Sequence, residues 1–332
     1  LGIAKLSVGQ VEDGVRRLEQ AVARRTGYLP ALFNLGLAYL RTGRAVEAVA
    51  AFRHVIKADA RNAGAWLNLG VAQVSAGMRE QAIDSFRAAT RFAPSDPVPA
   101  RNLANLLVEQ DESGDALPIY THLLEKDGSD LVALIGMAAA KERLGAREEA
   151  VDFYERVLTI DVDNLPAHTN IAPQLERLGR FDEAEAHFRR AVELNEKRPQ
   201  PMHNLIGYLI RTRSNDAVAP LCEEGDGRWP EDPYFLERLA GHCYRRLGDL
   251  DAGRNAVATL LGRFPDNVTG FELRVSDPEG ALTPEEIETL KTRIDRGDDD
   301  AETRGRLCFV LFEHWHRMGD TGYFDDAGRF WL

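Results

Sequence analysis

The sequence predicts an all-α protein built as a solenoid of stacked helical hairpins. Asparagine recurs every 34 residues, with Gly136 at the one interruption; the series is Asn34, Asn68, Asn102, Asn170 and Asn204. Three further columns keep this step: Leu, Met or Ile directly after each of these positions, alanine from Ala48 to Ala184, and an aromatic residue from Phe52 to Phe188. A period between 20 and 50 residues indicates a repeat array, so we expect function on a surface and not in an enclosed pocket.

Each 34-residue unit predicts two amphipathic helices. In residues 63–96, the first helix is indicated by residues at three- and four-residue spacing that share one face, namely Trp66, Leu69, Gly70 and Gln73. Gly77 ends it, and Ala82, Phe86 and Ala89 mark a second helix that Pro94 closes. Small residues at Gly70 and Ala82 allow close approach of the two backbones, beside which Trp66 and Phe86 fill the space. One such pair has too small a core to fold alone, so neighbouring pairs must stack.

This pattern resembles the tetratricopeptide repeat, whose signature is most complete between Trp66 and Pro94. The units in phase are 29–62, 63–96, 97–130, 131–164, 165–198 and 199–232, with a partial repeat at 1–28 and a unit shifted by one residue at 234–267. The resemblance implies a right-handed α-solenoid in which the first helix of each pair lines a concave groove. Both ends of the sequence cut through repeats, so we expect a fragment of a longer protein.

The sequence changes character after Asn267. Residues 268–282 lack a helical period and contain Gly270, Pro278 and Gly280, which predicts a linker. A helical extension is expected at 283–332. It opens with a capping box at Thr283–Glu286, continues with a helix started by Asp298–Asp300, and ends in a truncated, divergent repeat marked by Gly319, Phe324–Ala327 and Trp331.

Composition narrows the class of protein. Of the 332 residues, 44% are hydrophobic, and no apolar run is long enough to cross a membrane. A net charge of −12 argues against nucleic acid as a partner. The three cysteines are few, odd in number and widely spaced, which favours reduced, buried thiols and a cytoplasmic location.

The sequence contains none of the usual catalytic patterns. Phosphate-binding loops, dinucleotide fingerprints and nucleophile elbows are missing. His314 and His316 are two residues apart and point to different sides of a helix, so they cannot share a metal. We therefore predict no catalytic residue, no cofactor and no metal in this chain.

The asparagine column is the first candidate binding surface. In the family, the groove face includes the residue before the Leu-Gly step, which is the asparagine here. An amide can donate to and accept from a peptide unit of any sequence. At about 0.5–1.5 kcal/mol per hydrogen bond, five asparagines could supply roughly 2.5–7 kcal/mol before ordering costs. The alternative is that each asparagine bonds only to local backbone or water.

An arginine column seven residues further along is the second candidate. Its members are Arg41, Arg143, Arg177, Arg211 and Arg245, and Arg238, Arg246, His203 and His242 add basic or titratable groups in the later repeats. Such arginines could bind carboxylates or phosphates through paired hydrogen bonds. The alternative is that they favour the carboxyl ends of their helices.

Two functions follow from these surfaces. The first is a scaffold that binds an extended peptide or protein segment in its groove, with a bias toward acidic partners. The second is a repeat arm of a larger transferase, because residues 282–332 resemble the segment preceding the catalytic domain of bacterial repeat-containing sulfotransferases. The asparagine column also suggests, less strongly, an arm fused to an O-linked glycosyltransferase.

Overall fold

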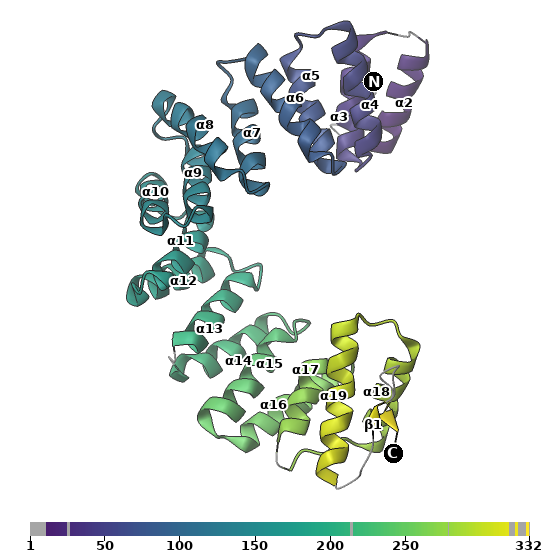
Figure 1. Cartoon of the computed structure of the whole chain (residues 1–332), viewed down its shortest axis with the longest axis vertical. Coiled ribbons are helices and arrows are strands. Elements are labelled where there is room, and N and C mark those ends of the chain that lie inside the picture. Colours follow the sequence, from purple (N-terminus) through teal and green to yellow (C-terminus); the bar gives the residue numbers. More distant parts are fainter. Residues whose placement is uncertain are drawn as a thin grey trace. The chain divides into compact units, whose positions relative to one another are not determined.

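The computed structural model describes residues 11–24, 27–212, 215–277, 279–318, 323–324 and 330–331. Helices arranged in successive hairpins dominate these residues, which confirms the predicted all-α solenoid (Figure 1). The chain divides into two compact units, Leu1–Ala184 and Glu185–Leu332, here named unit 1 and unit 2.

Unit 1 consists of regularly alternating helices. They are α2 (Val11–Arg24), α3 (Leu29–Arg41), α4 (Ala45–Ala58), α5 (Ala63–Ser75), α6 (Arg79–Phe92), α7 (Pro97–Glu109), α8 (Ser113–Lys126), α9 (Leu131–Arg143), α10 (Arg147–Ile160) and α11 (Leu165–Arg177), while α12 (Phe181–Leu194) crosses the boundary between the units. Each helix from α2 to α10 packs against the next, and first helices of successive pairs also touch, as α7 and α9 do. The first helices thus form a common row.

The helix boundaries follow from residues that recur with the repeat. The first helices α5, α7, α9 and α11 begin after side chains that accept a backbone N–H of the first turn, namely those of Asn62, Asp96, Asp130 and Asn164. First helices end at glycines in the left-handed region, Gly43, Gly77, Gly145 and Gly179, with φ between 73° and 79°. In the third helix pair, Asp111 occupies the position of the helix-ending glycine and has a φ of 63°.

Close approach between paired helices requires the small residues that the sequence predicted. A Cβ atom on Gly70 would lie 2.5 Å from the ring of Phe86, which is buried. The ring of Tyr120 packs instead against Gly136, where a Cβ atom would overlap it. This packing gives a physical reason for the interruption of the asparagine column at Gly136.

Unit 2 continues with helices of less regular length. They are α13 (Gln200–Thr212), the 3₁₀ turn η1 (Asn215–Ala217), α14 (Val218–Arg228), α15 (Tyr234–His242), the π-helical turn η2 (Cys243–Leu247), α16 (Leu250–Arg263), α17 (Val268–Ser276), α18 (Pro284–Arg296) and α19 (Ala301–Met318). Cys222 and Cys243 are buried as predicted, Cys308 is half-buried, and the described residues contain no disulfide. Among the described residues, no helix is long and apolar enough to span a membrane.

The predicted linker at 268–282 is wrong for its first nine residues, which form α17. Asn267 caps this helix by accepting the N–H of Gly270 at 2.7 Å. Gly270 does not break the helix; it permits close packing, because a Cβ atom there would lie 2.8 Å from Leu261. Phe271 and Leu273 are buried in the same core as Leu261, so helical packing continues past residue 267.

The extension begins as predicted, and most of its end lies outside the described residues. Thr283 and Glu286 form the expected capping box of α18, and Asp300 accepts the N–H of Thr303 at the start of α19. Gly319 and residues 325–327 of the predicted divergent repeat lie outside the described residues. The described part there contains no second helix: the two-residue strands β1 (Tyr323–Phe324) and β2 (Phe330–Trp331) pair antiparallel.

Candidate functional site: a row of first helices with an arginine-lined cavity

The asparagine column lies on the first helices, and all five side chains are half-buried. The Nδ2 of Asn34 donates to the Pro30 carbonyl at 2.6 Å, and the Nδ2 of Asn68 donates to the Gly64 carbonyl at 2.8 Å. These bonds fix the amides but leave each Oδ1 and one N–H available. The alternative of hydrogen bonds to local backbone therefore applies at these two positions, where it uses one N–H of each side-chain amide.

The other three asparagines have different surroundings. Asn170 lies beside the buried hydroxyl of Tyr154, and Asn204 accepts a hydrogen bond from Gln200 at 3.0 Å. The Asn102 side chain makes no hydrogen bond within the described part of the chain. The column thus offers polar groups along the row of first helices without a uniform set of contacts.

The arginine column differs between the units. In unit 1, Arg143 forms an ion pair with Asp111 at 2.5 Å, while Arg41 and Arg177 are exposed. In unit 2, the guanidinium of Arg211 lies over Gly207, with Nη1 3.3 Å from the place a Cβ atom would occupy. Arg245, the next member, contributes to a cavity.

A π-helical turn shapes this cavity and explains the one-residue shift in the repeat. Asp232 is still in phase with Asn62 and lies just before α15, where it accepts the N–H of Tyr234 at 3.1 Å. The glycine that ends the helix would be expected at 247 but is Gly248, with φ 67°, because η2 accommodates one extra residue. Such π-helical turns are often found at functional sites.

The cavity has a volume of about 380 Å³ and lies between α13, α15 and η2. Its lining residues are Ile210, Glu237, Arg238, Gly241, His242, Arg245 and Arg246. Three of the residues predicted as binding residues, Arg238, His242 and Arg245, are therefore brought together. Arg238 stands one 34-residue step after Asn204, so arginine takes the place of asparagine here.

Sequence reasoning missed Gly241, although its spacing contained a signal. Gly207 and Gly241 are one 34-residue step apart, at the groove position three residues after the asparagine column. The missing side chain lets Arg245 fold across its own helix, where its Nε donates to the Gly241 carbonyl at 3.3 Å. A Cβ atom on Gly241 would lie 2.7 Å from Nη2 of Arg245. Glycine is thus the residue that admits this arginine conformation.

The cavity arginines have no acidic partner within the residues that the structure describes. Neither Arg238, Arg245 nor Arg246 forms an ion pair, whereas Arg254, Arg263 and Arg293 of unit 2 pair with Asp277, Asp226 and Asp299. Glu237 is the one carboxylate of the lining, and one of its oxygens accepts the Asn267 amide at 2.7 Å.

Tyr234 packs against Arg238, one of the arginines that line the cavity. The guanidinium of Arg238 lies over its ring, 4.8 Å from the centroid. Burial raises the pKa of Tyr234, while the charges of Arg238 and Arg211 act in the opposite direction. The ring also stacks on His203 at 3.9 Å, which fixes the surface on which Arg238 rests.

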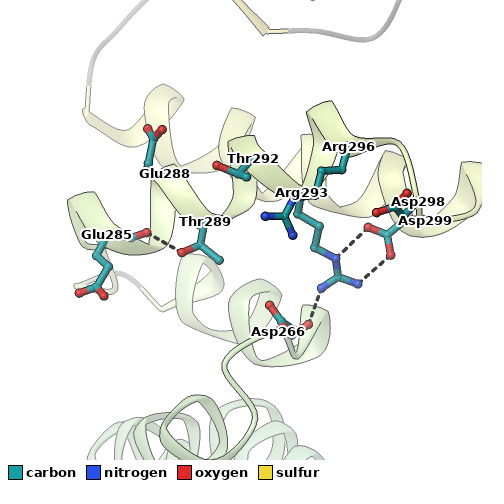
Figure 2. Close-up of a pocket in the computed structure, with 9 residues that line it drawn as sticks. All are labelled: Asp266, Glu285, Glu288, Thr289, Thr292, Arg293, Arg296, Asp298 and Asp299. Atoms are coloured by element: carbon teal, nitrogen blue, oxygen red, sulfur yellow. Dashed lines mark hydrogen bonds and ion pairs between the residues drawn. The ribbon is translucent and has the colours of Figure 1, made fainter.

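A second cavity in unit 2, of about 680 Å³, has the opposite charge (Figure 2). Five carboxylates and two guanidiniums line it, together with Thr289 and Thr292; the charged residues are Asp266, Glu285, Glu288, Asp298, Asp299, Arg293 and Arg296. Figure 2 shows Arg293 bonded to both Asp299 oxygens, at 2.8 Å each, and to the Asp266 carbonyl at 2.6 Å. This arginine has a structural role that those of the first cavity lack.

Stacked hairpins with a 34-residue period define an α-solenoid of helix pairs. Sequence models of the tetratricopeptide repeat match residues 1–63, 47–97, 133–166 and 166–198. The chain is a tetratricopeptide repeat protein, as its repeat signature predicted.

Solved structures are similar to parts of this chain, and no curated protein matches the sequence. YrrB, described as a tetratricopeptide repeat protein with an unusual peptide-binding site, is 18% identical, with a TM-score of 0.46 over 56% of this chain and 96% of its own. MamA of MSR-1 is 26% identical, with a TM-score of 0.44 over 51% and 97%. MamA from Desulfovibrio magneticus RS-1 is 17% identical, with a TM-score of 0.47 over 50% and 94%.

Proposed function

We propose that this protein is a non-catalytic scaffold that binds an extended segment of a partner protein along its first helices. The observation that carries the proposal is the asparagine column in unit 1. Asn34 and Asn68 each hold their amide in place with one hydrogen bond and keep an acceptor and a donor for a ligand. A peptide backbone presents the complementary groups at every residue, whatever its sequence.

The arginine-lined cavity of unit 2 adds a preference for acidic partners. Arg238, Arg245 and Arg246 are exposed and unpaired within the described residues, in a chain of net charge −12. A negatively charged side chain of the bound segment would form charge-assisted hydrogen bonds there. The alternative of a transferase arm stays a prediction, which sequencing of the gene beyond Leu332 would test.

Replacement of Asn34, Asn68 and Asn102 with alanine tests the scaffold proposal. We expect the full chain to select peptides from a random 15-residue display library, and the triple variant to bind the selected peptides about ten- to thousandfold more weakly, since each of three lost hydrogen bonds costs about 0.5–1.5 kcal/mol. Affinities are measured by fluorescence anisotropy.

The matched control is Asn255→Ala, which removes an exposed asparagine from α16. It should leave peptide affinity unchanged. If the triple variant is folded, as shown by circular dichroism, and binds the same peptides as tightly as the parent, the asparagine column is not the binding surface.

A further inference from the structure

We infer that the arginine-lined cavity of unit 2 is a receptor for a tetrahedral dianion, supplied by a phosphorylated side chain of the bound segment. The inference rests on the proposed function, because it places the phosphate on the segment that the scaffold holds. It is carried by three features of the cavity: the number of unpaired arginines, the glycine that orients one of them, and the π-helical turn that adds another.

The charge of the cavity calls for more than one negative charge. Three guanidiniums face a single carboxylate, Glu237, which is already bonded to Asn267. Like charges gathered around one cavity repel each other, and this repulsion disfavours the folded state unless an anion neutralises it. One carboxylate has one charge and two oxygens, whereas a phosphate monoester at neutral pH has a charge of about −1.5 to −2 and three acceptor oxygens.

The geometry gathers the donors at one place. Gly241 lets the Arg245 guanidinium lie back across α15, and the bond from Nε to the Gly241 carbonyl holds it there. The planar head keeps its Nη groups for a ligand, in the arrangement that suits paired bonds to phosphate oxygens. The Arg238 guanidinium is held in position by its contact with the face of the Tyr234 ring.

The π-helical turn supplies the third donor. Arg245 and Arg246 are consecutive, and consecutive residues of a regular α-helix do not share a face. The π-helical turn η2 contains about one residue more than an α-helical turn. Both arginines line the same cavity. The residue inserted into the repeat therefore brings a second guanidinium to the side of Arg245.

The test uses the full chain and three fluorescent ten-residue Gly/Ser peptides that differ at one central position: phosphoserine, serine or glutamate. We expect the phosphoserine peptide to bind at least tenfold more tightly than the other two and than free inorganic phosphate. Arg245→Gln should reduce its affinity at least tenfold, since hydrogen bonds to charged groups are the stronger ones. Gly241→Ala should do the same by displacing Arg245.

Two matched controls separate the site from general effects. Gly262→Ala introduces the same methyl group in α16, where nothing lies within 4 Å, and Arg228→Gln removes an exposed arginine that pairs with Glu224. Both should bind the phosphoserine peptide like the parent. Circular dichroism checks folding; since Arg245 is exposed, its variant should fold even if Gly241→Ala does not.

Each other outcome overturns the inference. Equal binding of the glutamate and phosphoserine peptides would make the cavity a carboxylate site, and free phosphate binding as tightly as the peptide would make it an inorganic-anion site. No binding, or binding unchanged in Arg245→Gln, would remove the cavity from consideration. The asparagine variants of unit 1 report separately on the scaffold proposal, so either idea can fail alone.

Discussion

The two units place different chemistry at the same positions of one repeat. In unit 1 the column before the Leu-Gly step is asparagine, and Arg143, seven residues further along the fourth pair, is neutralised by Asp111. In unit 2 the same two positions of the pair formed by α15 and α16 are Arg238 and Arg245, both without an acidic partner among the described residues. The same repeat positions thus present mainly neutral amides in unit 1 and concentrated positive charge at this pair of unit 2.

This difference teaches how a repeat protein acquires selectivity without a new fold. The helices of unit 1 keep a regular length, so each side-chain column stays aligned. In unit 2 one inserted residue and one glycine change the local geometry enough to bring three arginines to one cavity. If the comparison is sound, the two surfaces should respond separately to substitution.

The largest expected effect is on the core of unit 1. Phe86→Ala should destabilise this unit by about 3–5 kcal/mol, since it leaves a cavity against Gly70 and the buried α7–α9 core. Repeat units interact mainly with their neighbours, so the damage should stay local. Hydrogen exchange should show lost protection in α5–α8 and retained protection in α15–α16, with binding of the phosphoserine peptide preserved.

Phe309→Ala is the control, because that ring is 55% exposed on α19 and its loss should change stability by less than about 0.5 kcal/mol. Loss of protection throughout unit 2 in the Phe86 variant would show that the units fold as one body. The separation of the two surfaces would then have no energetic basis.

The second prediction concerns arginines that unit 2 uses for its own structure. The Arg254 guanidinium lowers the pKa of Asp277 to about 2, and the Asp277 side chain is 1% exposed. Because an unfolded Asp titrates near 3.9, this carboxylate contributes about 2 kcal/mol of stability that is fully present above about pH 5. The contribution is lost as the pH falls through 4 towards 2.

Urea unfolding of the parent and of Asp277→Asn measures this contribution. The difference between them should be about 2 kcal/mol at pH 6 and should shrink at pH 2.5. Asp251→Asn, which removes a 92% exposed partner of Arg254, should change stability by less than about 1 kcal/mol at either pH. A parent-to-variant difference that does not depend on pH would contradict this role. At pH 7 the Asp277→Asn variant should still bind the phosphoserine peptide if structural and cavity arginines are distinct.

The fold was predictable to the extent that its signals were periodic. The 34-residue columns located the hairpins of unit 1, since each column reflects a packing requirement such as Gly70 against Phe86. The interpretation of residues 268–276 as part of a linker was wrong because Gly270 resembles a helix breaker in sequence, whereas its role depends on contact with Leu261 in the preceding helix. The capping position of Asn267, however, was a signal available in the sequence.

The candidate site was predictable only in part. Spacing identified Arg238 and Arg245 as groove residues, but it could not show which arginines lack acidic partners. Arg143 and Arg245 occupy the same column, yet of the two only Arg143 forms an ion pair among the described residues. The one-residue shift was visible in sequence as a change of phase. Its meaning required the backbone, since an insertion in a loop and a π-helical turn leave the same trace in the sequence.

The smallest expected effect tests whether the ion pair of Arg143 alone accounts for the difference in anion binding between the two units. Asp111 adopts a left-handed φ of 63° where other pairs have glycine, and it neutralises Arg143. Asp111→Gly should change stability by less than about 1 kcal/mol, because relief of the unfavourable backbone conformation offsets loss of an exposed ion pair. Asp111→Asn is the matched control, since asparagine tolerates this conformation but removes the charge.

Both variants free Arg143, yet neither should gain a second site for the phosphoserine peptide. Unit 1 has Ala139 three residues after the asparagine column, where unit 2 has Gly241, and α9 is a regular helix without the wider turn that brings Arg246 beside Arg245. Titration that shows two sites per chain in either variant would mean that an acidic neighbour is all that distinguishes the units. One site per chain would assign the difference to the glycine and the π-helical turn.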